Sequence, residues 1–483
     1  MPIEPPIRDA VAAIVGAGNV LTGADLAPYV TDWRDRYHGR AVLVARPGTA
    51  AEVAAVVRLC SDRGIPVVPQ GGNTGLCGAA TPDASGTAIV LRLDRMNRIR
   101  SVSRLDGTVE VEAGCVLQAV QAAAEAAGMF FPLSLGAEGS CQVGGNIATN
   151  AGGTAVLRYG PMRDLVLGLE VVLPDGTLCD WLTPLRKNNM GYDLKQLFVG
   201  SEGTLGIITA AVLKVFPRPA QTATAMVTLD GPEQALTLLE SLRAALGDRL
   251  SSFEVLNRAQ VEIVLEQTEA VAMPFAAPAP WYVLIEATDT LDRYDLREAL
   301  ENLLAEALDA GTIGDAVVAG SAAQAAALWK VRHSVSEGNR KAGYGVTHDT
   351  AVPLRHQAAF VRAVERRLAA EFPDGRLLMV GHMGDGNIHV IQMLGAAQAA
   401  TEQGRDAAAA RINRIVDEET LRLHGSISAE HGIGQTNKRR LLEARGEADV
   451  ALMRAIKSAV DRKLLFNPGK VFDMAPPAGR GAH

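Results

Sequence analysis

The chain has 483 residues, a formal net charge of −7 and 48% hydrophobic residues, which fits a soluble globular enzyme of two or three domains. It has no basic excess and only 4% aromatic residues, which argues against nucleic-acid binding. No run of about 18 apolar residues predicts a transmembrane segment, and the N-terminus lacks a signal-peptide pattern. Five cysteines without a C-x-x-C pattern indicate reduced thiols, so a cytoplasmic protein is predicted.

The first half of the chain alternates strand and helix patterns. Apolar runs predict strands at residues 41–44, 66–69, 88–91, 108–111, 165–173 and 206–216. Helical periodicity predicts helices at 51–63 and 117–127, the second ended by Gly128. Pro217-Arg218-Pro219 marks the best domain boundary.

The second half predicts a small α+β domain followed by a helical tail. Strands are expected at 222–229 and 281–286, and helices at 232–246, 293–308, 355–371, 407–423 and 437–465. The predicted division is therefore 1–217, 218–435 and 436–483.

A histidine hairpin is the most informative segment. Asp385-Gly386 is a strong two-residue turn signal between apolar runs, and it would place His382 directly opposite His389 on one sheet face. Two imidazoles held in this way can share a metal ion, with Glu430 as a third ligand and His431 beside it as a base. The alternative is a hydrogen-bonded turn without metal.

Three glycine-rich loops lie in the first half, at residues 69–78, 136–153 and 200–206. Such loops can turn backbone N–H groups toward a diphosphate, although none matches a G-x-G-x-x-G or P-loop pattern. A single loop of this kind is more often a tight surface turn. Three in one domain predict a large phosphate-bearing cofactor, because so many glycines are entropically costly unless the backbone must approach a ligand.

These motifs, in this order, resemble the FAD-dependent D-2-hydroxyacid dehydrogenases of the vanillyl-alcohol-oxidase type. The resemblance covers residues 35–472. The segments 139–145 and 187–198 look most like D-2-hydroxyglutarate dehydrogenases, and D-lactate dehydrogenases are more distant.

The resemblance implies an α+β fold in three parts. Residues 1–217 would form a PCMH-type FAD-binding domain, and 218–435 a substrate or cap domain with an antiparallel sheet and the metal site. Residues 436–483 would form a C-terminal helical segment that returns to the FAD domain. FAD should be noncovalent, because no histidine lies near the glycine loops. The implied cofactor-binding residues are Pro69, Gly71, Gly72, Asn73, Thr74, Gly75, Gly78, Gly136, Ser140, Gly144, Gly145, Asn146, Asn150, Gly152, Gly206, Ile207 and Asn467.

The resemblance also implies a mechanism. His382, His389 and Glu430 would hold a divalent metal, usually zinc, and His431 would take the hydroxyl proton while a hydride passes from C2 to flavin N5. Arg332 would bind the C1 carboxylate, with Ser336, Thr347 and His431 also at the substrate. From the residues alone, the pattern around Arg332 is more typical of a surface helix cation, and His431 could equally be part of a capped turn.

Two positions depart from relatives that act on 2-hydroxyglutarate. Thr347 and Ile391 stand where those relatives tend to carry Lys and Asn, so a partner for a distal carboxylate is missing unless Lys341 or Arg340 supplies it. D-2-hydroxyglutarate is the first expected substrate, with D-lactate or another D-2-hydroxy monoacid as the alternative. The electron acceptor would be an electron-transfer flavoprotein or a quinone, and a homodimer is possible. An oxidase using dioxygen, or a non-catalytic flavin-binding subunit, remains the rival, although retention of the metal set argues against the latter.

Overall fold

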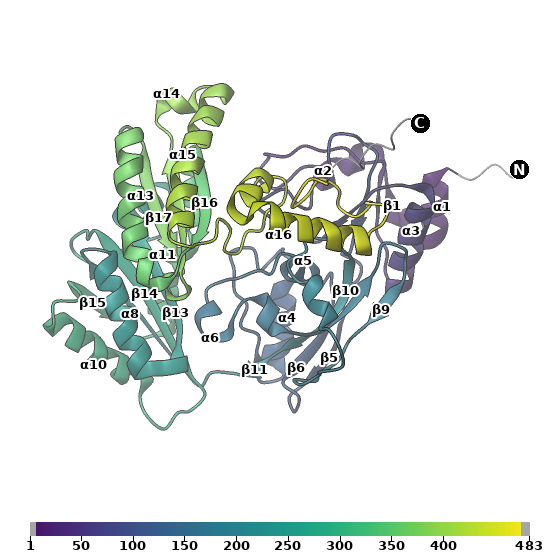
Figure 1. Cartoon of the computed structure of the whole chain (residues 1–483). Helices are drawn as coiled ribbons and strands as arrows, with labels where there is room; N and C mark the ends of the chain where they lie inside the picture. The colour runs from purple at the N-terminus through teal and green to yellow at the C-terminus, as the bar shows by residue number, and fades with distance from the viewer. Residues whose placement is uncertain (1–5, 475–483) are drawn as a thin grey trace, which may run out of the picture.

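The computed structural model describes residues 6–474, which form two lobes joined at several points (Figure 1). The N-terminal lobe contains residues up to about the end of β11 (Phe216–Pro217), together with the C-terminal helix. The second lobe contains the residues between them. Among the described helices, none is long and apolar enough to cross a membrane.

Two sheets and a short strand pair build the N-terminal lobe. The first sheet has the order β1 (Val20–Leu21), β2 (Leu43–Ala45), β4 (Ile89–Arg92), β3 (Val67–Gln70). The second has the order β5 (Ile99–Ser103), β6 (Thr108–Glu112), β10 (Ile207–Lys214), β8 (Val166–Val172), β9 (Leu178–Asp180), and β11 pairs with β7 (Met129–Phe130). The helices are α1 (Ile7–Val15), α2 (Ala27–Val30), α3 (Ala50–Arg63), α4 (Leu117–Ala126), α5 (Val143–Ala148), α6 (Val156–Tyr159) and α7 (Met162–Leu165).

Local sequence signals explain where these helices begin and end. Thr49 caps α3 by accepting a hydrogen bond from the Glu52 N–H, and Gly64 ends the helix at φ +64. One face of α3 is buried in the core of the lobe, which includes both sheets. The predicted helix at 51–63 is therefore confirmed.

The second lobe is built on a seven-stranded sheet in which every pair is antiparallel. The order is β15 (Asp315–Val318), β12 (Gln221–Leu229), β14 (Trp281–Asp289), β13 (Leu250–Asn257), β17 (Arg376–Gly381), β18 (Asn387–Met393), β16 (Gly345–Ala351). The helices are α8 (Pro232–Leu246), α9 (Arg258–Gln267), α10 (Leu296–Asp309), α11 (Ala322–His333), α12 (Val335–Ala342), α13 (Gln357–Glu371), α14 (Ala396–Ala399) and α15 (Glu402–Arg422).

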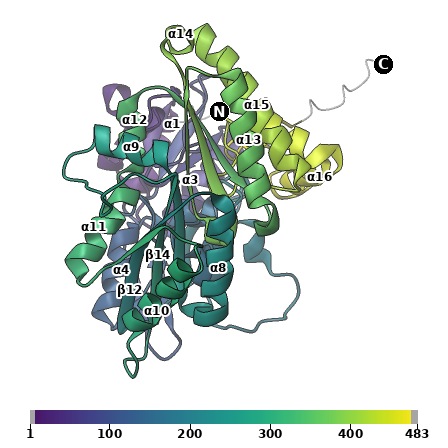
Figure 2. The ribbon, with the colours of Figure 1, turned by 90° about the vertical axis from the view of Figure 1, so that its left-hand side faces the viewer.

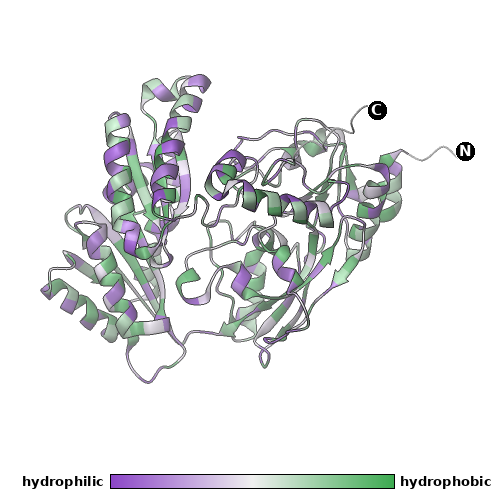
Figure 3. Cartoon of the chain, viewed as in Figure 1, coloured by the Kyte–Doolittle hydropathy of each residue, from purple (hydrophilic) through white to green (hydrophobic). Residues whose placement is uncertain are grey.

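Helices cover both faces of this sheet. One face packs on α8, α10, α13 and α15, and the other packs on α9, α11 and α12. Figure 2 shows α9, α11 and α12 on the left of the sheet, and α8 and α13 on the right. In Figure 3 the strands are mostly hydrophobic, and the outer helix faces are mostly hydrophilic. This distribution buries the apolar stripe of each helix against the sheet.

The C-terminal helix α16 (Lys438–Val460) begins next to α15, where Arg440 pairs with Asp417, and runs across the N-terminal lobe (Figure 1). It contains a non-helical residue, Gly446, at φ +76. Within α16, Lys457 is buried, and its ammonium bonds to Asp461 and to the Thr204 carbonyl. Beyond the helix, Phe466 is part of the N-terminal core. The α+β prediction is confirmed.

Candidate functional site

The hairpin between β17 and β18 brings His382 and His389 together, but not in the predicted register. Val380, not His382, is paired with His389. The two imidazoles are therefore diagonal neighbours, with ring centroids 5.8 Å apart and planes nearly perpendicular at 83°. The prediction that they face each other directly is wrong.

The cause lies in the turn, which is longer than two residues. A short 3-10 turn, η6 (Met383–Asp385), is closed by Gly386 at φ +93. The N–H groups of Asp385 and Asn387 both donate to the His382 carbonyl, at 3.1 and 3.2 Å. Gly386 provides the left-handed conformation, which a residue with a side chain adopts only with strain. The centre of the turn therefore lies one residue earlier than Asp385-Gly386 alone suggests.

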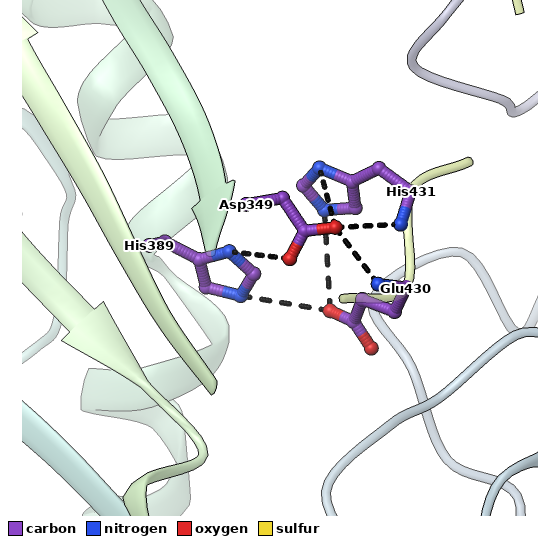
Figure 4. A group of neighbouring side chains, drawn as sticks. All are labelled: Asp349, His389, Glu430 and His431. Carbon is purple, nitrogen blue, oxygen red and sulfur yellow. Dashed lines mark hydrogen bonds and ion pairs between the residues drawn. The ribbon is translucent and has the colours of Figure 1, made fainter. Parts of the chain in front are cut away.

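The segment after α15 is fixed to the sheet by Asp349 on β16. Its carboxylate accepts hydrogen bonds from the backbone N–H groups of Glu430, at 2.8 Å, and His431, at 2.7 Å. Asn387 donates to the other oxygen at 2.9 Å. Figure 4 shows Asp349 between His389 and the Glu430–His431 backbone. Asp349 therefore orients both residues that the sequence assigns to catalysis and metal binding.

One carboxylate oxygen, Glu430 Oε1, is the centre of the cluster. It lies 3.5 Å from His389 Nε2, 3.6 Å from His382 Nε2 and 3.9 Å from His431 Nε2. Ligands of a tetrahedral ion with bonds of 2.0–2.2 Å lie roughly 3.3–3.6 Å apart. The spacing of Glu430 from His382 and His389 therefore suits two ligands of one small cation.

A second, tighter grouping does not include His382. Ligand atoms of Asp349, His389, Glu430 and His431 all lie within 4.8 Å of one another. We regard Asp349 as a less suitable ligand, because its oxygens already accept N–H bonds from the backbone and from Asn387. His382 is more suitable, since its Nε2 faces Glu430. Metal binding by the predicted set of His382, His389 and Glu430 stays a proposal.

The two hairpin histidines have pKa values shifted in opposite directions. Burial opposes protonation of His382, but the Glu254 and Glu430 carboxylates outweigh it and raise its pKa to about 10. Burial lowers the pKa of His389 to about 4, although Asp349 opposes this shift. Burial opposes ionisation of Glu430, but the positively charged His382 imidazole, 3.6 Å away, outweighs it and lowers the pKa of this carboxyl. His389 is thus neutral near pH 7 and available as a donor of its lone pair.

Arg332 lies in the last turn of α11 and is not a surface cation. Its side chain is 14% exposed, and its Nε donates to Glu254 Oε2 at 2.7 Å. The other oxygen of Glu254 accepts from His382 Nδ1 at 2.6 Å. Arg332 Nη2 lies 3.5 Å from His382 Nε2. The guanidinium therefore points at the cluster, and within residues 6–474 neither Nη group has a hydrogen bond to a carboxylate.

The remaining predicted substrate residues lie on neighbouring elements. Ser336 is exposed in the first turn of α12, next to α11. Thr347 pairs with Ile391 across β16 and β18. This pair is two residues along the strands from the pair Asp349 and His389, and so lies on the same face of the sheet. Ile391 is buried in an apolar cluster with Val331 and Val335. Neither Thr347 nor Ile391 carries a charge, and Lys341 is exposed and paired with Glu337 at 2.6 Å.

The three glycine loops converge on one pocket in the N-terminal lobe. Among the predicted cofactor residues, its walls include Pro69, Gly71, Gly144, Gly145, Gly206 and Ile207. A side chain at Gly145 would meet only open space. Buried amide oxygens of Gln142, Asn146 and Asn467 have no hydrogen-bond partner among the described residues. An open cradle with unpartnered polar atoms suits a large polar cofactor.

The other predicted cofactor residues surround this pocket or support it. Asn467 donates to the carbonyls of Ala79 and Glu202, whose residues line it. Gly72 packs against the Ser140 carbonyl, and Asn73 donates to the Thr31 carbonyl at 2.9 Å. Asn150 accepts from the Arg163 N–H at 2.8 Å, and the Gly78 backbone lies on the Tyr37 ring. Gly75 and Gly136 are exposed, and Thr74 is half-buried beside them in the first loop.

The glycine loops also reach the histidine cluster. The Gly153 N–H donates to Glu430 Oε2 at 3.1 Å. A Cβ at Gly152 would lie 2.4 Å from the same oxygen, so a larger residue there would displace the Glu430 carboxylate. Glu202, in the third loop, accepts from the N–H groups of Ile433 and Gly434. The pocket and the cluster thus meet at the junction of the two lobes.

Glu254 and Asp349 were not assigned a role from the sequence. Each is buried in a strand, β13 or β16, that was not predicted, because buried polar residues interrupt the apolar alternation there. A usable signal existed only for Asp349, whose neighbours in sequence include Val352-Pro353 in the family motif. No motif in the sequence marks Glu254.

Comparison with solved structures shows the fold. The chain superimposes on p-cresol methylhydroxylase with a TM-score of 0.75 at 16% identity, covering 97% of this chain and 96% of that chain. A 4-ethylphenol oxidase from Gulosibacter chungangensis gives a TM-score of 0.71 at 17% identity, covering 96% of each. These flavoproteins share the architecture that the resemblance implied.

Relatives in sequence are considerably more similar. A D-2-hydroxyglutarate dehydrogenase of Xanthomonas citri pv. viticola is 37% identical over 453 residues, 93% of this chain and 93% of the relative. A mitochondrial D-2-hydroxyglutarate dehydrogenase of Bos taurus is 37% identical over 478 residues, 98% of this chain and 85% of the relative. A Schizosaccharomyces pombe protein, provisionally named a mitochondrial D-lactate dehydrogenase, is 35% identical over 456 residues, 92% and 85% of the two chains.

The predicted cytoplasmic location is contradicted by these names. The cattle and fission-yeast relatives are both named as mitochondrial proteins. The inference went wrong because unpaired cysteines indicate a reducing environment and do not specify a compartment.

Two family descriptions cover most of the chain. The FAD binding domain matches residues 41–181, and the C-terminal domain of FAD linked oxidases matches residues 218–471. The first match contains two of the glycine loops, and the second contains the whole histidine cluster. With the relatives above, these matches show that the chain belongs to the FAD-linked oxidases and is an FAD-dependent D-2-hydroxyacid dehydrogenase.

Proposed function

We propose that this dehydrogenase oxidises D-2-hydroxyglutarate with the help of a divalent metal, zinc being the first candidate. His382, His389 and Glu430 would hold the ion, His431 would act as the base, and Arg332 would bind the C1 carboxylate. The observation that supports this best is the position of Glu430 Oε1, which lies 3.5–3.9 Å from three imidazole Nε2 atoms. The test is a dye-reduction assay over D- and L-2-hydroxy acids, with and without a chelator.

The donor set suits such an ion. The Nδ1 of His382 is occupied by Glu254, which leaves Nε2 to face Glu430. His389 Nδ1 has no hydrogen-bond partner in the part of the chain that the structure describes, but it lies 3.5 Å from the Asp349 carboxylate. A ligand on its Nε2 would strengthen that contact. When bound, the ion would act as a Lewis acid toward the hydroxyl oxygen of the substrate. With two histidine nitrogens and the Glu430 oxygen as ligands, one coordination position would stay open for the substrate hydroxyl.

The residues of the chain would divide the remaining work. Arg332 would bind the C1 carboxylate end-on through its two Nη groups, since Nε is occupied by Glu254. His431 is 21% exposed, and its ring is stacked on His389 with centroids 5.2 Å apart, so it can reach a hydroxyl beside the ion. It would accept the hydroxyl proton. Bound FAD would be the hydride acceptor.

Substitution of Arg332 tests the carboxylate clamp. Arg332→Lys should raise KM and also lower kcat, because an ammonium cannot reproduce the planar pair of N–H donors. Steady-state kinetics with D-2-hydroxyglutarate measure both. Arg258→Lys, a change at an arginine whose side chain bonds to the Pro278 and Ala279 carbonyls away from the cluster, is the control. Kinetics unchanged by Arg332→Lys would remove Arg332 from the substrate site.

Noncovalent attachment of FAD is also part of the proposal. No histidine is among the residues that line the glycine-loop pocket. Acid precipitation should therefore release the flavin absorbance into the supernatant. Flavin absorbance that stays with the precipitated chain would demonstrate a covalent bond.

A second candidate substrate is a shorter or more apolar D-2-hydroxy acid. Thr347 and Ile391 form one uncharged pair beside the cluster, and Lys341 is exposed and paired with Glu337. A buried carboxylate without a partner is costly. The relative named a D-lactate dehydrogenase accords with this alternative.

The ranking of kcat/KM decides between the candidates. The panel is D-2-hydroxyglutarate, D-malate, D-lactate and D-2-hydroxyisocaproate, each with its L-enantiomer. We expect D-2-hydroxyglutarate to lead. A lead of D-lactate or D-2-hydroxyisocaproate would select the monoacid alternative, and preference for an L-enantiomer would overturn the proposed stereochemistry.

A further inference from the structure

A fully buried carboxylate connects the substrate clamp to the metal site. Glu254 is 0% exposed and lies in the centre of the sheet, on β13. Val255 pairs with Gly381, so the next position in register places Glu254 beside His382. One oxygen accepts from His382 Nδ1 at 2.6 Å, and the other accepts from Arg332 Nε at 2.7 Å.

We infer that Glu254 is a positioning residue that fixes the metal-binding tautomer of His382 and the orientation of the Arg332 guanidinium at the same time. This inference rests on the proposed roles of those two residues. It assigns to Glu254 no contact with substrate, metal or flavin.

The chemistry of the two contacts explains the inference. A carboxylate only accepts hydrogen bonds, so the proton between Glu254 and His382 must be on Nδ1. The lone pair of a neutral His382 is then on Nε2, which faces Glu430. The second oxygen holds Nε of Arg332, which leaves Nη2 directed toward the cluster.

The pair of contacts also balances charge. Both oxygens of the buried Glu254 carboxylate are hydrogen-bonded, one to His382 and one to Arg332, which offsets the cost of burying the charge. Since one carboxylate serves both groups, a change in it should alter metal affinity and substrate binding together.

Glu254→Gln tests this with almost no change in shape. An amide can accept from one of the two donors, but its N–H group then faces the other donor. We expect zinc affinity of the metal-stripped, FAD-loaded protein to fall by about 10–100-fold, the usual effect of losing such an outer partner. The KM for D-2-hydroxyglutarate should rise by roughly tenfold, because a hydrogen bond between charged groups is lost. FAD content should be unchanged.

Glu286→Gln is the matched control. Glu286 is on the adjacent strand β14 and bonds the same helix, with one oxygen accepting from Trp329 Nε1 at 2.7 Å and from Thr224. An amide oxygen can still accept both bonds, so zinc affinity and KM should match the wild type. Wild-type zinc affinity and KM in Glu254→Gln would overturn the inference.

A second measurement does not depend on the variant. In wild-type protein with ¹⁵N-labelled histidine, the Nδ1 of His382, assigned by comparison with His382→Ala, should be protonated with and without zinc. An unprotonated Nδ1 would overturn the inference even if Glu254→Gln does not fold. Failure of the wild-type chain to bind zinc would count against the metal proposal alone, and the Nδ1 signal and the KM of Glu254→Gln would still decide the role of Glu254.

Discussion

His382→Ala should lose the bound metal and reduce turnover to background. The side chain supplies one of the two nitrogens that lie 3.5–3.6 Å from Glu430 Oε1, and its removal leaves two ligands from the proposed set. Two ligands do not hold a divalent ion tightly, so purified variant protein should contain far less than one ion per chain. Metal content by atomic emission and turnover with D-2-hydroxyglutarate measure the two effects.

A control separates this result from general damage to the fold. His356 lies outside the cluster and contacts Arg355 on the protein surface, so His356→Ala should keep metal and activity. FAD content should equal that of wild type in both variants, because the glycine-loop pocket is in the other lobe. Wild-type activity in a metal-free preparation, or full metal content in His382→Ala, would exclude His382 as a ligand.

His431→Ala should keep both metal and FAD and still lower the rate of flavin reduction by about 10²–10⁴-fold, the usual contribution of a general base. The Nε2 of His431 is 3.9 Å from Glu430 Oε1, farther than that of His382 or His389. Its ring is parallel to that of His389, with an interplanar angle of 6°. It is therefore placed beside the proposed ion and not among its first ligands.

Stopped-flow reduction of the flavin, with metal analysis of the same sample, distinguishes the two roles. A slow reduction with full metal content identifies a base. Loss of metal to the extent seen in His382→Ala would identify His431 as a ligand, in keeping with the grouping of Asp349, His389, Glu430 and His431. Reduction near the wild-type rate would exclude both roles.

The structure explains why neither lobe would form this site alone. Glu430 accepts a hydrogen bond from Gly153, which belongs to the N-terminal lobe. Its carboxylate also faces His382 and His389, which belong to the second lobe. Glu202 binds the backbone just after His431. Two glycine loops, the histidine hairpin and the segment after α15 thus hold one another in place at the junction of the lobes.

Local sequence determined the parts of the site that depend on backbone chemistry. The glycine loops are visible in the sequence as glycine-rich runs, and Gly386 stands where the turn needs a positive φ. Likewise Thr49 and Gly64 mark the ends of α3 within the chain segment itself. Such signals act over a few residues, so the position of the histidine hairpin was predicted although its register was not.

Only the tertiary structure decided which distant groups complete the site. Glu254 and His382 are 128 positions apart, and Gly153 and Glu430 are 277 apart. The strands that carry Glu254 and Asp349 contain buried polar residues, whose burial is stabilised by partners elsewhere in the chain. An alternating apolar pattern cannot encode such a strand, because the energy that holds it comes from hydrogen bonds and ion pairs formed after the sheet and its helices have assembled.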